Sequence, residues 1–272
     1  MDRQANRTVH RIAGLLVGLM TVLAWSSPSP GAVKTEQVRY RQGPTELVGM
    51  LAWDDSVKGR RPGVMVVHEW WGMNDYIRKR AVQVASLGYV VLAADIYGGG
   101  VSTGDPKEAK ALSGSLMKGD RMLLRERASA GLQILLDHPL VDSARVAAIG
   151  YCFGGTTVLE LARSGAPLAG VVSFHGRLDT PSPEKDRKIR ARILVLTGAD
   201  DPQVPLSQIA AFASEMRGQN VDWHMVVYGG AVHSFTNPAA GSRPSSGSAY
   251  NEKADLRSWE QMKLFFSEIF AP

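Results

Sequence analysis

The single cysteine of this 272-residue chain, Cys152, lies in the segment Gly150-Tyr151-Cys152-Phe153-Gly154-Gly155. It follows an apolar run, residues 145–149, and precedes residues 156–163, whose apolar side chains recur at helical spacing. A strand that turns sharply into a helix strains the residue at the turn, and flanking glycines leave room for that conformation. The thiol would then be exposed at a helix N-terminus, where a thiolate is stabilised. The pattern predicts a nucleophile elbow; the alternative is a buried core cysteine in a glycine-rich bend.

A cysteine nucleophile needs a base to take its proton and an acid to orient that base. Asp200 and Asp201 follow one apolar run, residues 192–197, and His233 follows the next. In the α/β-hydrolase arrangement the acid and then the histidine follow the nucleophile, each after a later strand. The order therefore predicts a Cys-Asp-His triad, and spacing alone leaves open which aspartate belongs to it. The alternatives are a turn aspartate before a proline and an exposed loop histidine.

The elements that would position these residues alternate between strand and helix. An antiparallel hairpin is expected at residues 37–41 and 46–53, and buried strands at 63–67, 89–94, 145–149, 168–174, 192–197 and 221–227. Helices are expected at residues 74–87, 106–117, 120–136, 156–163, 206–217 and 252–270. This alternation predicts an α/β fold with a mostly parallel central sheet and helices on both faces, and the order of the acid and the histidine after Cys152 is that of the α/β-hydrolase fold. Residues 95–104, which contain four glycines, are expected to form a mobile loop over the pocket mouth.

The first 32 residues differ from the rest of the chain. Three arginines precede the uncharged apolar run 12–25, and a stretch rich in serine and proline follows. This is the pattern of a secretory signal peptide, cleaved after Ser26 or Ala32. The apolar run is shorter than the roughly 20 residues that span a bilayer, so we expect no stable membrane span after cleavage, with an uncleaved tether as the alternative. The expected protein is exported, periplasmic or secreted, with one domain at residues 33–272.

The count of one cysteine excludes a disulfide within the chain and a cysteine-ligated metal site. A lone thiol in an exported protein favours a reactive role. His68, His175 and His224 follow or lie on different strands without metal-ligand spacing, so no metal and no cofactor are expected. His175 is interpreted as a satisfied core histidine or as part of the pocket floor. The net charge of +5 is small and scattered, which favours a small-molecule partner over nucleic acid, and a monomer is expected.

Three motifs together resemble the dienelactone hydrolase family. They are Gly150 to Gly155, Gly198 to Asp201 with Val204-Pro205, and His233-Ser234-Phe235, and the resemblance covers about residues 37–270. The resemblance implies a triad of Cys152, Asp201 and His233. It selects Asp201 over its neighbour because the family's aspartate lies three residues before Val204-Pro205.

A fourth matching motif, residues 68–74, places Glu69 where the family has a glutamate that binds the resting thiol and helps to deprotonate it. A carboxylate in an apolar pocket of tryptophans has a raised proton affinity, which suits that role. The alternative is a helix-entry acid before Asn74. By analogy with the family and the elbow geometry, the backbone N–H groups of Trp70 and Phe153 would form the oxyanion hole.

The substrate pocket is expected to include Trp71, Tyr97, Tyr151, Phe235 and Asn237. The family holds a substrate carboxylate with two arginines, one after an Asp-Leu-Tyr-like motif and one shortly after His-Ser-Phe. Glycines and Asn237 stand at those places here, and neither can make a bidentate clamp. The resemblance therefore implies a hydrolase that cleaves a small ester or lactone through an acyl-cysteine intermediate, and the missing arginines favour a neutral substrate. A non-catalytic exported binding or thiol-sensing protein is the alternative, and a peptidase is a weaker one.

Overall fold

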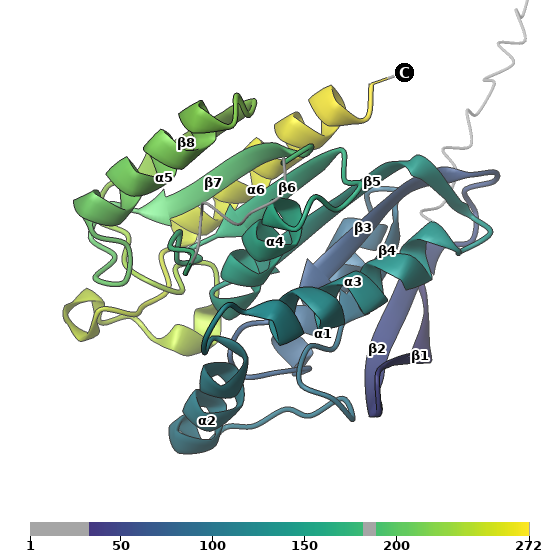
Figure 1. The fold of residues 1–272 in the computed structure, drawn as a ribbon, viewed down its shortest axis with the longest axis horizontal. Helices are drawn as coiled ribbons and strands as arrows, with labels where there is room; N and C mark the ends of the chain where they lie inside the picture. The colour runs from purple at the N-terminus through teal and green to yellow at the C-terminus, as the bar shows by residue number, and fades with distance from the viewer. Residues whose placement is uncertain (1–32, 182–188, 272) are drawn as a thin grey trace, which may run out of the picture. The chain divides into compact units, whose positions relative to one another are not determined.

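The computed structural model describes residues 33–181 and 189–271, so the predicted signal peptide lies outside the described residues. An eight-stranded sheet with the order β1-β2-β4-β3-β5-β6-β7-β8 forms the centre of the domain (Figure 1). The strands are β1 (Val33–Gln42), β2 (Thr45–Asp54), β3 (Arg61–Val67), β4 (Val90–Ala94), β5 (Val141–Tyr151), β6 (Gly170–Phe174), β7 (Arg192–Gly198) and β8 (Trp223–Tyr228).

Most of the strand pairs are parallel. β1 and β2 form an antiparallel hairpin at one edge, with Arg41 opposite Glu46, and β2 is antiparallel to β4. The five remaining pairs, from β4-β3 to β7-β8, are parallel. The predicted edge hairpin and the mostly parallel sheet are both confirmed. Because the strands from β3 onward run in one direction, their carboxyl ends meet at one edge of the sheet, where ligands bind in open α/β folds.

Helices cover both faces of the sheet (Figure 1). α1 (Asp75–Ala85) and α6 (Glu252–Ile269) pack on one face, and α3 (Met122–Leu136), α4 (Phe153–Arg163) and α5 (Leu206–Gly218) pack on the other. α2 (Pro106–Leu116) lies at the end of the sheet where the strands point. Two short 3₁₀ helices, η2 (Pro238–Ala240) and η3 (Pro244–Ser246), precede α6. Among the described residues, no helix combines the length and apolar character needed to cross a membrane.

The alternation of side chains along each strand produces two separate cores. Val64 and Val66 of β3 belong to the core under α1 and α6, whereas Met65 and Val67 belong to the core under α3, α4 and α5. Successive side chains of a strand point to opposite faces, so a strand covered on both sides must be apolar throughout. This is why the strands appear in the sequence as continuous apolar runs.

The loop after β4 differs from its predicted behaviour. The buried carboxylate of Asp95 accepts hydrogen bonds from the backbone N–H groups of Val48, Tyr97, Gly98 and Gly100, at 2.8–2.9 Å. The expectation of a mobile loop is therefore wrong for residues 95–100, which are fastened to β2. The glycines there allow positive φ angles and close packing, and only residues 103 and 104 of the loop line the cavity described below.

Candidate active site

The turn from β5 into α4 holds Cys152 in a strained conformation. Its backbone angles are φ 54° and ψ −116°, and α4 begins at the next residue. A Cβ atom on Gly150 would lie 2.1 Å from the carbonyl oxygen of Gly154. A Cβ atom on Gly154 would lie 2.3 Å from the carbonyl oxygen of Val67. A side chain at either position would collide with backbone atoms, so both glycines are required. The sequence pattern predicts an elbow for this same reason.

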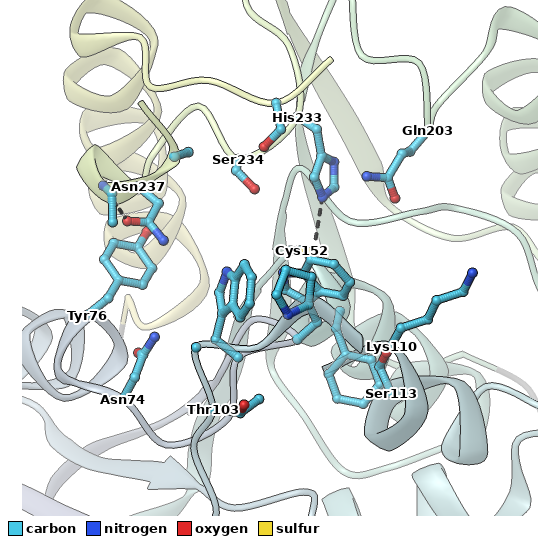
Figure 2. A pocket seen from close by; sticks show the side chains of 18 of the residues that line it. Asn74, Tyr76, Thr103, Lys110, Ser113, Cys152, Gln203, His233, Ser234 and Asn237 are labelled. Atoms are coloured by element: carbon cyan, nitrogen blue, oxygen red, sulfur yellow. Dashed lines mark hydrogen bonds between the residues drawn. The ribbon is translucent and has the colours of Figure 1, made fainter. Parts of the chain in front are cut away.

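Three of the predicted site residues come together at this turn. The sulfur atom Sγ of Cys152 lies 2.9 Å from Nε2 of His233 (Figure 2). Nδ1 of His233 lies 2.9 Å from Oδ2 of Asp201. Cys152 follows β5, Asp201 follows β7 and His233 follows β8, so the parallel sheet delivers all three to one edge. The side chain of Asp201 is buried against His233, whereas Asp200 is exposed.

The aspartate loop and the histidine loop approach each other closely behind this array. The backbone N–H of Asp200 donates to the carbonyl oxygen of Ala231 at 3.0 Å. A Cβ atom on Gly198 would lie 2.3 Å from that same carbonyl oxygen. Gly198 therefore permits the contact that fixes Asp201 beside His233.

The electrostatic environment of His233 favours its protonated form. Burial lowers the pKa of this imidazole, but the negative charge on the Cys152 sulfur and the hydrogen bond with Asp201 outweigh it and raise the pKa to about 10. An imidazolium between a thiolate and a carboxylate is the arrangement that activates a cysteine nucleophile. The site can therefore hold Cys152 and His233 as an ion pair.

Glu69 lies in the same region, but its nearest partner is not the thiol. Its Oε2 atom accepts a hydrogen bond from Nδ2 of Asn237, and its buried Oε1 atom has no hydrogen-bond partner among the described residues. Burial raises the pKa of Glu69, and the hydrogen bond from Asn237 opposes that rise. In this structure the Cys152 sulfur points to His233 instead, so the predicted contact between Glu69 and the resting thiol is not made.

The two residues expected to supply the oxyanion hole both line the cavity beside Cys152. Phe153 is the first residue of α4, where a backbone N–H has no carbonyl partner within the helix. Trp70 lies in the loop after β3, which a hydrogen bond from the Tyr97 hydroxyl to the Trp70 carbonyl oxygen holds at 2.9 Å. Phe153 follows Cys152 directly in the chain, and Trp70 shares the cavity wall with both residues.

The cavity has a volume of about 1020 Å³, and Cys152 and His233 lie in its wall. Trp71 and Asn237 line it, as the sequence predicts. Figure 2 shows Asn74, Tyr76 and Asn237 grouped on one side of Cys152 and Lys110, Ser113 and Gln203 on the other.

Three of the expected pocket residues do not line this cavity, so the prediction is wrong for them. Tyr151 points to the opposite face of the sheet, where its ring stacks on Phe174 at 4.6 Å. Phe235, two residues after His233, is fully buried and packs against the ring of His175. Tyr97 is buried under the loop that it fastens. Successive side chains along a strand point to opposite faces of the sheet, so a residue adjacent to Cys152 in sequence need not face the pocket.

Sequence reasoning missed the contribution of α2 to the cavity wall. Lys110, Ser113, Gly114 and Met117 line the cavity, and Thr103 and Gly104 precede them. Their spacing of three and four residues places them on one face of the helix and its C-terminal end. That spacing was the available signal, but nothing in the sequence shows that this face turns toward Cys152. Among the described residues, no group of three or more His, Cys, Asp and Glu side chains could hold a metal ion.

Comparison with known proteins identifies the family of the chain. The sequence profile of the dienelactone hydrolase family matches residues 47–270. The chain belongs to the dienelactone hydrolase family. The predicted resemblance and the prediction of a hydrolase are therefore confirmed.

Solved structures and curated relatives agree with this placement. A protein called m3DLH is 46% identical, with a TM-score of 0.84, over 89% of this chain and 100% of that chain. A dienelactone hydrolase-like promiscuous phosphotriesterase from metagenomic libraries is 42% identical, with a TM-score of 0.81 and the same coverage. A protein from Saccharolobus solfataricus, provisionally named a carboxymethylenebutenolidase, is 27% identical over 86% of this chain and 98% of its own. The predicted α/β-hydrolase fold is confirmed.

Proposed function

We propose that this dienelactone hydrolase family member cleaves neutral carboxylic esters or lactones through an acyl-cysteine intermediate. The observation that carries the proposal is the array of Cys152, His233 and Asp201, joined by two contacts of 2.9 Å in the wall of the cavity. Acyl transfer requires a nucleophile, a base that takes its proton and an acid that orients the base, and this array can supply all three.

In the first half-reaction the Cys152 thiolate attacks the carbonyl carbon, and the carbonyl π electrons move onto oxygen. The backbone N–H groups of Trp70 and Phe153 stabilise this oxyanion. When the tetrahedral intermediate collapses, the C–O bond to the leaving group breaks, and the protonated Nε2 of His233 gives its proton to the departing alkoxide. The products of this step are an alcohol, or the ring-opened hydroxyl of a lactone, and an acyl-cysteine.

In the second half-reaction water attacks the acyl-cysteine. His233 accepts a proton from that water, and collapse of the second oxyanion breaks the C–S bond to release the acid and the thiolate. Asp201 stays ionised throughout, orients Nδ1–H of His233 and stabilises the imidazolium. Glu69 is proposed, as the family implies, to accept the thiol proton when the thiol turns away from His233.

The preference for a neutral substrate rests on the groups around the site. Both ends of the Asn237 side chain are occupied, since Nδ2 donates to Glu69 and Oδ1 accepts from the Ala239 N–H at 2.9 Å. Two cations, Lys110 and Arg177, line the cavity, but Nε of Arg177 already donates to Asp179 at 2.9 Å. These exposed side chains lack the fixed geometry of a bidentate clamp. The cavity is also large for a ligand pocket, which allows substrates bigger than a simple lactone.

The test is turnover of a matched substrate panel by the purified enzyme and by Cys152→Ala. The panel contains neutral esters of short and long acyl chains, a neutral lactone and a dienelactone that carries a carboxylate. We expect the neutral substrates to be favoured by roughly tenfold in kcat/KM, the effect of about one lost charged contact. Cys152→Ala should abolish hydrolysis. Turnover that survives Cys152→Ala would exclude the acyl-cysteine mechanism, and binding without turnover would favour the non-catalytic alternative.

Neutral phosphotriesters are a second candidate substrate class. The observation that favours them is the 42% identity, over the whole of that chain, to the promiscuous phosphotriesterase. A phosphotriester arm in the same panel tests this class directly. Activity on it that is lost in Cys152→Ala would assign both chemistries to one nucleophile.

We also propose that residues 1–32 are a signal peptide and that the mature enzyme is exported. The proposal rests on the order of arginines, apolar run and small residues at the start of the chain. Mass spectrometry of the mature protein from the extracytoplasmic fraction would identify the N-terminus. An intact Met1 in the cytosolic fraction would contradict the proposal.

A further inference from the structure

A series of buried polar side chains connects the backbone of the nucleophile to the histidine loop. His175 follows β6 directly, and its side chain is fully buried. The backbone N–H of Cys152 is shared between the carbonyl oxygen of Phe174, at 3.0 Å, and Nδ1 of His175, at 3.1 Å. On the other side of the ring, Nε2 of His175 lies 2.7 Å from Oγ1 of Thr236. One imidazole therefore contacts both the elbow and the loop that carries His233.

These contacts fix the tautomer of His175. An amide N–H can only donate, so Nδ1 must present its lone pair to Cys152 and the proton must be on Nε2. The Nε2–H group then donates to the Thr236 hydroxyl. Burial, together with the charges of His233 and Arg80, lowers the pKa of His175 well below its usual value. His175 is therefore neutral across the working pH range, and both bonds persist.

The Thr236 end of the series is anchored to two helices. Its hydroxyl lies 2.7 Å from the Tyr76 hydroxyl of α1, and its carbonyl oxygen accepts a hydrogen bond of 2.7 Å from Arg80. Arg80 also forms a buried ion pair with Asp255 of α6. Thr236 lies three residues after His233, so this anchor also holds the backbone of the histidine loop.

His175 also packs against the base itself. Its ring lies edge-to-face with the ring of His233, with centroids 5.4 Å apart. The backbone of His175 is unusual as well, with a φ of 40°, close to the positive φ of Cys152. Two residues in this region of φ need surrounding contacts to hold them.

From this geometry we propose that His175 and Thr236 are positioning residues that set the separation of the Cys152 sulfur from Nε2 of His233. The proposal rests on the proposed acyl-cysteine function, in which that separation decides whether the thiolate forms and attacks. A displacement of about 1 Å between reacting groups can lower a rate by roughly 100-fold. Neither residue touches the substrate, because neither lines the cavity.

Thr236→Val tests the link while keeping the shape of the side chain. We expect kcat for a neutral ester to fall by roughly 10- to 100-fold with KM within about twofold, because the reacting groups and not the cavity wall are displaced. Alkylation of Cys152 by iodoacetamide should slow at neutral pH, and its pH midpoint should move up, since the thiolate loses its imidazolium partner. Thr236→Ser keeps the hydroxyl and should retain most of the ester turnover and most of the alkylation rate of Cys152.

Two further variants separate positioning from stability. Thr197→Val is the matched control, because Thr197 is buried in β7 and its hydroxyl has no hydrogen-bond partner among the described residues. It should leave kcat and the alkylation profile unchanged. His175→Asn tolerates the positive φ and can accept from the Cys152 N–H, but it is too short to reach Thr236. The double variant His175→Asn/Thr236→Val should lose little more kcat than Thr236→Val alone, because both substitutions break the same link.

The alkylation profile keeps this test independent of the substrate question. The titratable and charged groups around the pair are His233, Asp201, Glu69, Tyr76, Tyr97, Tyr151 and Arg80. All of them are unchanged in the Thr236 variants, so a shifted midpoint reports the Cys152–His233 separation. If Thr236→Val and His175→Asn lower Tm but leave kcat and the midpoint at wild-type values, the residues are structural and the proposal fails. If no ester is turned over but the midpoint still shifts, the proposed function fails and the positioning role stands.

Discussion

At the scale of single residues, two adjacent aspartates experience opposite environments. Asp201 is buried. Its Oδ1 atom accepts a hydrogen bond from the Gln203 N–H, and its Oδ2 atom contacts Nδ1 of His233. Asp200 is exposed, and its backbone N–H donates to the carbonyl oxygen of Ala231. Of these two neighbouring aspartates, the carboxylate of Asp201 therefore contacts the His233 imidazole, whereas that of Asp200 faces the solvent.

We predict that Asp201→Asn lowers kcat by roughly 10³- to 10⁴-fold without unfolding the protein, because the amide holds His233 in the wrong tautomer. Asp200→Asn is the matched control and should stay within about twofold of wild type, since an exposed carboxylate without a role in the array is replaced. Ester turnover and Tm of both variants check the prediction. The reverse ranking would show that Asp200 is the functional acid.

The buried carboxyl of Glu69 predicts a pH-dependent stability. Burial raises its folded-state pKa above the ordinary value of 4.5. The stabilising contribution of the protonated form is thus fully present below 4.5 and is lost as pH rises through the folded-state pKa. Glu69→Gln cannot ionise, and its oxygen can still accept from Asn237.

Glu69→Gln should therefore be more stable than wild type at about pH 8, by roughly 2–4 °C in Tm, and should differ little at about pH 4. Thermal unfolding across this pH range measures the difference. A constant Tm difference at every pH would mean that Glu69 has the same pKa in the folded and unfolded chain.

At the scale of elements, the turn between β5 and α4 depends on its glycines. Gly154 packs against the end of β3, where an added Cβ would meet backbone carbonyl oxygens that cannot move independently. The elbow and the end of β3 are therefore packed backbone against backbone. This packing ties the start of α4 to the end of β3 and the loop that follows it.

We predict that Gly154→Ala destabilises the protein by more than about 3 kcal/mol, because strand and helix must separate. Gly114→Ala is the control, since Gly114 lies within α2 and an added Cβ meets nothing within 4 Å. It should stabilise the protein by about 0.5–1 kcal/mol. Denaturant unfolding compares the two, and equal stabilities would contradict the close packing of the elbow.

The loop after β4 gives the second prediction at this scale. Gly100 has a φ of 69°, and an added Cβ would lie 3.2 Å from the Val48 side chain. We expect Gly100→Ala to lower Tm by several degrees, about 1–2 kcal/mol of strain and crowding. Gly104→Ala, with open surroundings and no positive φ, should change Tm little. A loss of substrate preference without a loss of Tm in Gly100→Ala would restore the mobile-loop interpretation.

At the scale of the whole molecule, the described domain begins with the edge strand β1 at Val33, directly after the predicted signal peptide. We predict that a protein consisting of residues 33–272 has the full esterase activity and an unchanged Tm, because all eight strands and the array belong to it. Expression with and without residues 1–32 checks this. A lower Tm of the shorter protein would show that the N-terminal residues contribute to the fold.

The sequence by itself determined the order of the elements and the residue types of the array. Continuous apolar runs predicted the buried strands, and glycines around Cys152 predicted the elbow, because local sterics and burial act over a few residues. Parallel strands then bring Asp201 and His233 to the edge that holds Cys152. The family motifs selected Asp201, and the contact with His233 agrees with that selection.

Only the tertiary structure decided which side chains surround Cys152. Tyr151 is adjacent to Cys152 in sequence but points into the opposite core, whereas α2 supplies part of the cavity wall from a distant part of the chain. The role of His175 likewise depends on Thr236, 61 residues away. Contacts between such distant residues are set by how loops and helices pack over the sheet, and no local pattern encodes them.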